Sequence, residues 1–174
     1  MTATATAPKF AADADRLVTL AFAISVGVIA AALVFEHVGG YKPCPLCLQE
    51  RYAYYFAIPA ALLALFLLRA GRAGLAALLM ALVALAYLVN FGLGGYHAGV
   101  EWGWWPGPTS CAGGTDGLTT SAGGLLGAIE KADVVRCDKA EWRMLGLSFA
   151  GWNALISLLL TYISVSAALK LRSA

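Results

Sequence analysis

Charged side chains are scarce in this sequence of 174 residues, in which Asp, Glu, Lys and Arg together make up only 13%. It contains no glycine-rich phosphate-binding motif, no Ser/His/Asp signature and no basic stripe of the kind that binds nucleic acid. The net charge of +2 requires no strongly charged partner. Internal repeats are also lacking, which leaves a single domain over residues 1–174.

Apolar residues are abundant instead, at 60% of the chain with a mean hydropathy of +0.75, unlike ordinary soluble domains. A soluble helical bundle would need polar faces at helical spacing, but residues 60–68 and 75–88 are apolar all round. We therefore predict an all-α integral membrane four-helix bundle. Its spans, each near the 20 or so residues that cross a bilayer, are residues 17–38, 48–68, 75–95 and 149–169, joined on one side by loops 39–47 and 96–148.

The first apolar run also raises the possibility of a cleaved signal peptide. It follows a polar tail over residues 1–15 and has no convincing small-residue cleavage site, so a retained span is favoured. An even number of spans places both termini on one side. Basic residues divide equally between the two sides, but Arg69 and Arg72 crowd the short link on the terminal side. The positive-inside rule then favours cytoplasmic termini and places all the cysteines outside, where disulfides persist.

The cysteines are arranged unevenly, because Cys44 and Cys47 form a CxxC whereas Cys111 and Cys137 share the long third loop. Three pairings are possible, although positions i and i+3 of a first helical turn lie within disulfide reach. A zinc site lacks a second compact ligand pair, so we expect no metal. Cys111 and Cys137 could equally form a structural disulfide without a redox role. An exposed CxxC at a helix start is a poor staple and a good redox centre.

The residues around the CxxC favour thiol chemistry. Pro45 suits the first position of a helix, which places Cys47 in the first turn. There the helix dipole and unpaired backbone N–H groups stabilise a thiolate. Arg51 lies one turn further on the same face and adds a permanent positive charge. The alternative for Arg51 is a membrane anchor, extended to the interface or paired with Glu50.

Several stretches closely resemble the disulfide bond formation protein B (DsbB) family, over roughly residues 16–170. The CxxC alone would be weak evidence, but four cysteines in this topology make the resemblance specific. The matching stretches follow the family's order: Phe35-Glu36-His37-Val38, Lys42-Pro43-Cys44-Pro45-Leu46-Cys47, Glu50-Arg51, Tyr96-His97-Ala98-Gly99-Val100-Glu101, Pro106-Gly107-Pro108, Cys137, Trp142 and Leu145-Gly146-Leu147.

The resemblance implies a thiol oxidoreductase of the bacterial inner membrane. Such an enzyme reoxidises a periplasmic DsbA-like thioredoxin-fold dithiol oxidase and delivers the electrons to a membrane quinone, ubiquinone or menaquinone. By position, Cys111 would be attacked by the partner's thiolate, and the released Cys137 would engage Cys44. Cys47 would then face the quinone ring.

The resemblance also assigns two residues to the quinone site. Arg51 matches the family's quinone-site arginine, and His97 matches a histidine near the same site. Two other functions stay open at this point. One is a quinone reductase of the vitamin K epoxide reductase type, in which the loop pair precedes the CxxC rather than following it. The other is a non-enzymatic membrane protein with two structural disulfides.

Overall fold

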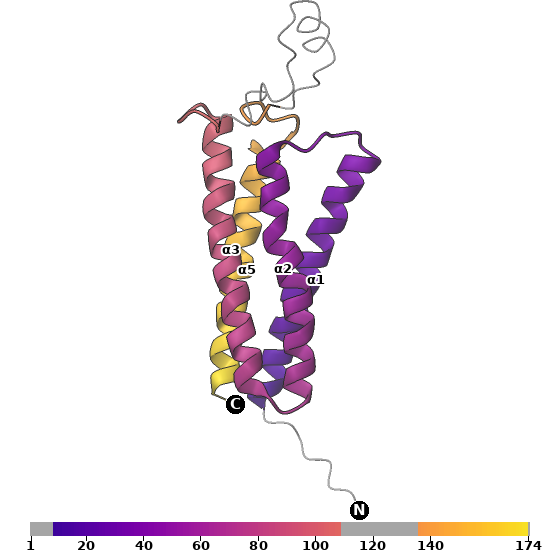
Figure 1. The fold of residues 1–174 in the computed structure, drawn as a ribbon, viewed down its shortest axis with the longest axis vertical. Helices are drawn as coiled ribbons and strands as arrows, with labels where there is room; N and C mark the ends of the chain where they lie inside the picture. Colours follow the sequence, from indigo (N-terminus) through magenta and orange to yellow (C-terminus); the bar gives the residue numbers. More distant parts are fainter. Residues whose placement is uncertain (1–8, 109–135, 174) are drawn as a thin grey trace, which may run out of the picture.

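The computed structural model describes residues 9–108 and 136–173, and these contain four long helices that lie side by side (Figure 1). The helices are α1 (Lys9–His37), α2 (Pro45–Arg69), α3 (Ala73–Glu101) and α5 (Phe149–Arg172). Each is long and apolar enough to cross a membrane. The predicted all-α four-helix membrane bundle is therefore confirmed. The start of α1, the end of α5 and the α2–α3 link lie at one end, opposite the α1–α2 connection.

The helix α3 is longer than the expected span, because it continues past residue 95 to Glu101. His97 and Glu101, which the sequence placed in a loop, thus lie in its last two turns. A Schellman motif ends the helix, in which Trp104 N–H bonds to Gly99 C=O at 2.9 Å and Gly103 N–H to Val100 C=O at 3.1 Å. Gly103 adopts φ +74°, a conformation that glycine tolerates.

The half of the bundle next to the termini is packed with small side chains, and we call it the alanine-packed half. Its core is filled mainly by alanine, with a few larger residues such as Met80 and Leu160 that are fully buried. Small residues let membrane helices approach closely. Large apolar side chains point outward instead, and Phe66 and Tyr162 are 68% and 71% exposed. This pattern is the one expected when lipid surrounds the bundle. The alanines of this core are Ala14, Ala21, Ala57, Ala60, Ala61, Ala64, Ala76, Ala77, Ala167 and Ala168.

A short hairpin leads into the last helix at the opposite end. Strands β1 (Arg143–Met144) and β2 (Leu147–Ser148) pair antiparallel around Leu145 and Gly146, both at positive φ. Ser148 then caps α5 by accepting a hydrogen bond from the Gly151 N–H at 3.3 Å. Trp152 Nε1 donates a hydrogen bond to the Met144 C=O at 3.2 Å, which holds the hairpin against the start of α5.

Candidate active site

The CxxC lies at the very start of α2. Cys44 is the N-cap and its sulfur accepts a hydrogen bond from the Cys47 backbone N–H at 3.2 Å. Pro45 occupies the first helical turn, as predicted, where its missing N–H costs nothing. Both cysteines are free thiols, with their sulfur atoms 2.6 Å apart, and Cys44 is buried whereas Cys47 is partly exposed. The pair is thus positioned to close and open as a disulfide.

The position that stabilises a thiolate is Cys44 rather than Cys47. The sequence placed this role on the first turn, but an N-cap side chain is the group that folds back onto the open N–H groups of a helix. The hydrogen bond from the Cys47 thiol lowers the pKa of Cys44 to about 4, and His97 contributes in the same direction against the effect of burial. The Cys47 backbone N–H and the Cys47 thiol therefore both stabilise a thiolate at Cys44.

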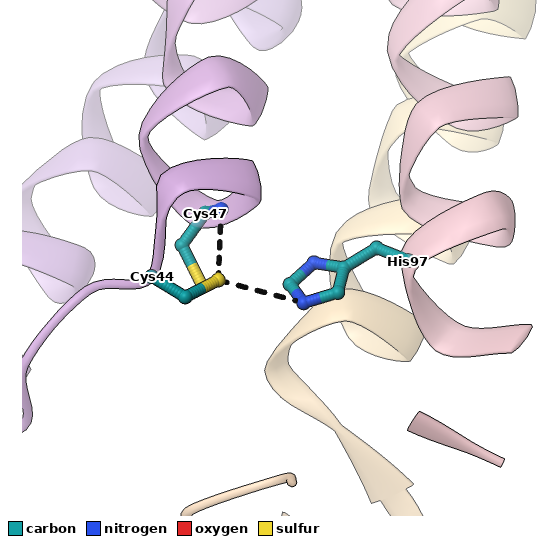
Figure 2. Close-up of side chains that lie close together, drawn as sticks. All are labelled: Cys44, Cys47 and His97. Atoms are coloured by element: carbon teal, nitrogen blue, oxygen red, sulfur yellow. Dashed lines mark hydrogen bonds between the residues drawn. The ribbon is translucent and has the colours of Figure 1, made fainter. Parts of the chain in front are cut away.

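His97 reaches Cys44 from the neighbouring helix α3, as Figure 2 shows. Its Nε2 lies 3.5 Å from the Cys44 sulfur and its Nδ1 lies 2.7 Å from Oε1 of Glu50. The other oxygen of Glu50 accepts a hydrogen bond from Asn153 Nδ2 at 2.9 Å. Both His97 and Glu50 are buried, so the imidazole ring is held on both sides within the bundle.

A polar network continues from this group into the bundle. The Asn153 Oδ1 atom accepts a hydrogen bond from the Tyr54 hydroxyl at 2.7 Å and another from Asn90 Nδ2 at 3.3 Å. Asn90 also donates to the Ser157 hydroxyl at 2.9 Å. Polar groups at membrane depth must find partners inside the protein. The network joins α2, α3 and α5, the helices that carry Glu50, His97 and Asn153.

A cavity of about 250 Å³ lies beside the CxxC. Cys47, Arg51 and His97 line it together with an aromatic wall. In that wall, Trp142 and Phe149 stack with ring centroids 4.7 Å apart, and Phe35 meets Phe149 edge-on at 5.1 Å. The cavity thus combines flat apolar surfaces with the guanidinium group of Arg51 and the two thiols of the CxxC. The three wall residues are Phe35, Trp142 and Phe149.

Arg51 is held at the cavity by an acidic residue from another helix. Its Nη1 donates to Oε2 of Glu36 at 2.6 Å, and both side chains are largely buried. The sequence proposed Glu50 as the alternative partner of Arg51, but Glu50 is engaged with His97. Glu36 lies in the last turn of α1. Its role was missed because a partner on a separate helix leaves no spacing signal.

Of the second cysteine pair, the structure describes Cys137, whereas Cys111 lies outside the described residues. Cys137 is disulfide-bonded and only 1% exposed. It belongs to one buried apolar cluster with Cys44, Leu46 and Val100, against which Cys47 also packs. The structure therefore brings Cys137 to the CxxC.

Other polar residues of the site were also missed from the sequence. Glu50, Glu101 and Asn153 all lie within helices that cross the membrane. Buried ionisable groups there are costly and are usually functional, which is the signal that could have revealed them. The structure also brings the sulfurs of Cys44 and Cys47 and a ring nitrogen of His97 within 4.8 Å of one another, a spacing that suits a metal ion.

A family model described as Disulfide bond formation protein DsbB matches residues 14–167. The chain belongs to the DsbB family. Three curated relatives are each named Disulfide bond formation protein B. Those of Aromatoleum aromaticum, Albidiferax ferrireducens and a Polaromonas species are 29%, 28% and 28% identical and cover 83%, 82% and 84% of this chain. The matches cover 86%, 80% and 85% of those proteins, respectively. No solved structure matches the chain.

Membership of the DsbB family defines the general activity. The protein is a multi-pass membrane protein of disulfide bond formation with an oxidoreductase role. The family resemblance found in the sequence is thereby confirmed. It also favours disulfide formation over the vitamin K epoxide reductase alternative. The free thiols of the CxxC and its thiolate-stabilising position at the helix start argue against purely structural disulfides.

Proposed function

We propose that the protein oxidises a periplasmic DsbA-like thioredoxin-fold dithiol protein and passes the electrons to a membrane quinone, ubiquinone or menaquinone. The observation that carries this proposal is that the CxxC contacts both a disulfide-bonded cysteine and a cavity. The disulfide-bonded Cys137 packs in one cluster with Cys44, while Cys47 lines the cavity with Arg51. A CxxC that adjoins both a second disulfide and a cavity suits transfer from one to the other.

The electrons would enter through the loop pair. The partner's thiolate attacks Cys111 of a Cys111–Cys137 disulfide, which forms a mixed disulfide and releases Cys137. Cys137 attacks Cys44 of the closed CxxC and releases Cys47. The partner's second thiol resolves the first mixed disulfide and frees Cys111. Each exchange forms one S–S bond and breaks one.

The last exchange returns the loop pair to its disulfide form. Cys111 attacks Cys137 in the Cys137–Cys44 disulfide, and Cys44 leaves. A sulfur with a low pKa leaves faster, and the pKa of Cys44 is lowered to about 4 by the hydrogen bond from Cys47. The CxxC is then a dithiol that carries the two electrons taken from the partner.

The cavity fits the head group of a quinone, because it offers aromatic faces, a cation and the Cys47 thiol in about 250 Å³. A bound quinone would accept the two electrons and two protons of the CxxC dithiol. Arg51 would donate a hydrogen bond to a ring oxygen while Glu36 fixes its guanidinium group. His97 would hold a proton at Nε2 beside the Cys44 sulfur, with Glu50 fixing the ring from Nδ1.

This chemistry requires the CxxC end of the bundle to face the periplasm of a bacterial inner membrane. Both termini would then be cytoplasmic. The crowding of Arg69 and Arg72 in the short α2–α3 link at the terminal end supports this orientation. Tagging either terminus and probing its accessibility from each side of the membrane checks the orientation.

The activity is tested with the purified protein in lipid nanodiscs, supplied with a reduced DsbA-like protein and a ubiquinone analogue. Loss of partner thiols and loss of quinone absorbance should proceed together, with one quinone reduced for each partner disulfide formed. Cys47→Ser should block quinone reduction, and Cys111→Ser should block transfer from the partner. Thiol oxidation that does not depend on quinone would contradict the proposal, as would full turnover in either variant.

A further inference from the structure

Three good ligands for soft metal ions converge at the start of α2. The sulfurs of Cys44 and Cys47 and a ring nitrogen of His97 all lie within 4.8 Å of one another, and Figure 2 shows the imidazole pointing toward the Cys44 sulfur. Thiolate and imidazole are the ligands that Zn²⁺ prefers. We propose that the dithiol state of the protein binds one thiophilic divalent cation, such as Zn²⁺, through these three residues.

The distances suit tetrahedral coordination. Zinc bonds of about 2.3 Å to sulfur and 2.05 Å to nitrogen place the two ligand atoms about 3.6 Å apart. The distance between Cys44 Sγ and His97 Nε2 is 3.5 Å. The two sulfurs are 2.6 Å apart and must separate by about 1 Å to reach tetrahedral spacing. Rotation of the partly exposed Cys47 side chain provides that movement.

The histidine already has the support that metal-binding histidines need. A ligating imidazole normally donates its second N–H to a carboxylate, which fixes the ring and directs the other nitrogen at the ion. His97 Nδ1 lies 2.7 Å from Glu50 Oε1, and Asn153 fixes the other oxygen of Glu50 at 2.9 Å. This arrangement directs Nε2 at the two sulfurs before any ion arrives.

A fourth ligand is available one turn further along α3. Oε1 of Glu101 lies 3.9 Å from His97 Nε2, and the Glu101 side chain is only 6% exposed. Its second oxygen, Oε2, is buried and has no hydrogen-bond partner among the residues that the structure describes. An unpaired carboxylate oxygen at this depth is costly, and coordination of a cation would satisfy it. Glu101 is not one of the three converging ligands, but it supplies a carboxylate next to His97 that could move in as the fourth.

Binding would depend on the redox state of the CxxC. The thiol protons are released when the sulfurs coordinate the ion, and no electron moves. A closed disulfide removes both thiolates, so the oxidised protein loses the site. The bound ion in turn prevents the two sulfurs from joining until it dissociates. Zinc would thus hold the CxxC in its dithiol form, a property that does not depend on which molecule accepts the electrons.

The test uses the full chain in nanodiscs, reduced and freed of reductant without oxygen, and titrated with Co²⁺ alone. We expect one Co²⁺ per reduced chain, with the intense visible bands of tetrahedral thiolate ligation, and displacement by Zn²⁺. The oxidised chain is the matched control and should show no such bands. The Cys111→Ser/Cys137→Ser double variant should bind equally well, since neither loop cysteine is a ligand of the proposed site. Equal binding by the reduced and oxidised forms would overturn the proposal.

Variants then identify the third ligand. His97→Ala should weaken Co²⁺ binding at least about tenfold, and Glu50→Gln about tenfold through the support of the ring. His97→Cys should restore tight binding, which separates loss of a ligand from misfolding. His37→Ala removes the other histidine of the chain, which is exposed at the end of α1, and should change nothing. Unchanged affinity in a folded His97→Ala variant would show binding by the dithiol alone and would overturn the site.

Discussion

The two halves of the bundle are packed with different kinds of side chain. In the alanine-packed half, buried positions such as Ala64 and Ala167 are fully enclosed and apolar. In the half around the CxxC, which we call the thiol half, Glu50, Asn90 and His97 are just as buried. Small apolar side chains suffice to hold membrane helices together. The costly polar residues of the thiol half are therefore explained by chemistry, and changes in the two halves should separate activity from stability.

The largest effect on activity is expected from Cys44→Ser. Serine is also a good N-cap, so its hydroxyl should keep the hydrogen bond from the Cys47 N–H and the helix should stay intact. Without the sulfur, quinone-dependent oxidation of the partner should fall at least about 10³-fold. Turnover above a tenth of the wild-type rate would show that Cys44 is not in the relay. Thermal unfolding of both proteins checks that the fold is retained.

Glu50→Gln should give the next largest loss, about 10²-fold in turnover. The amide keeps the shape of Glu50 but not its charge, so the His97 ring loses the carboxylate that orients it. Asp15→Asn is the matched control, because it removes a carboxylate charge at the opposite end of the bundle. Activity of the control should stay within about twofold of the wild type. Equal losses in both variants would argue for a general effect of charge on the fold.

Arg51→Ala should raise the apparent KM for quinone about tenfold and leave the KM for the protein partner unchanged. The variant removes the cation that lines the cavity beside Cys47. Glu36→Gln keeps that cation and loosens its position, so a smaller increase is expected. Steady-state kinetics with each substrate varied in turn distinguishes the two constants. A change only in the KM for the partner would assign Arg51 to a structural role.

Of the variants considered, Met80→Ala should have the smallest effect on turnover and the largest effect on the free energy of unfolding. Met80 is fully buried in the alanine-packed half, so truncation leaves a cavity that costs about 2 to 5 kcal/mol of unfolding free energy. Turnover per folded molecule should remain within about twofold, because the thiol half is unchanged. Unfolding and turnover are measured on the same nanodisc sample. A loss of turnover without a loss of stability would show that activity also depends on the alanine-packed half.

The fold was predictable because each helix carries its own signal. A run of apolar residues long enough to cross a bilayer requires no knowledge of its neighbours. The CxxC and its position before α2 were readable for the same reason, since Pro45 and the two cysteines are local in sequence. The capping position of Cys44 is also a local feature, because it directly precedes Pro45 at the start of the helix.

The partners across helices were not predictable. The Arg51–Glu36 pair joins α2 to α1, and the His97–Glu50 pair joins α3 to α2. Each pair depends on how far the helices are rotated and shifted along their axes, which hydrophobic runs do not determine. Glu50 and Arg51 are adjacent in sequence yet face different helices. The sequence consequently proposed Arg51 and His97 as site residues but not the acidic residue that contacts each.

The central claim is that the CxxC delivers electrons to quinone and that the loop pair reaches quinone only through it. Two double variants test it in a single turnover without any partner protein. The Cys111→Ser/Cys137→Ser variant keeps only the CxxC and, once chemically reduced, should reduce one quinone per chain. The Cys44→Ser/Cys47→Ser variant keeps only the loop pair and should reduce none. Quinone reduction by the loop pair alone, or its failure with the CxxC alone, would contradict the account.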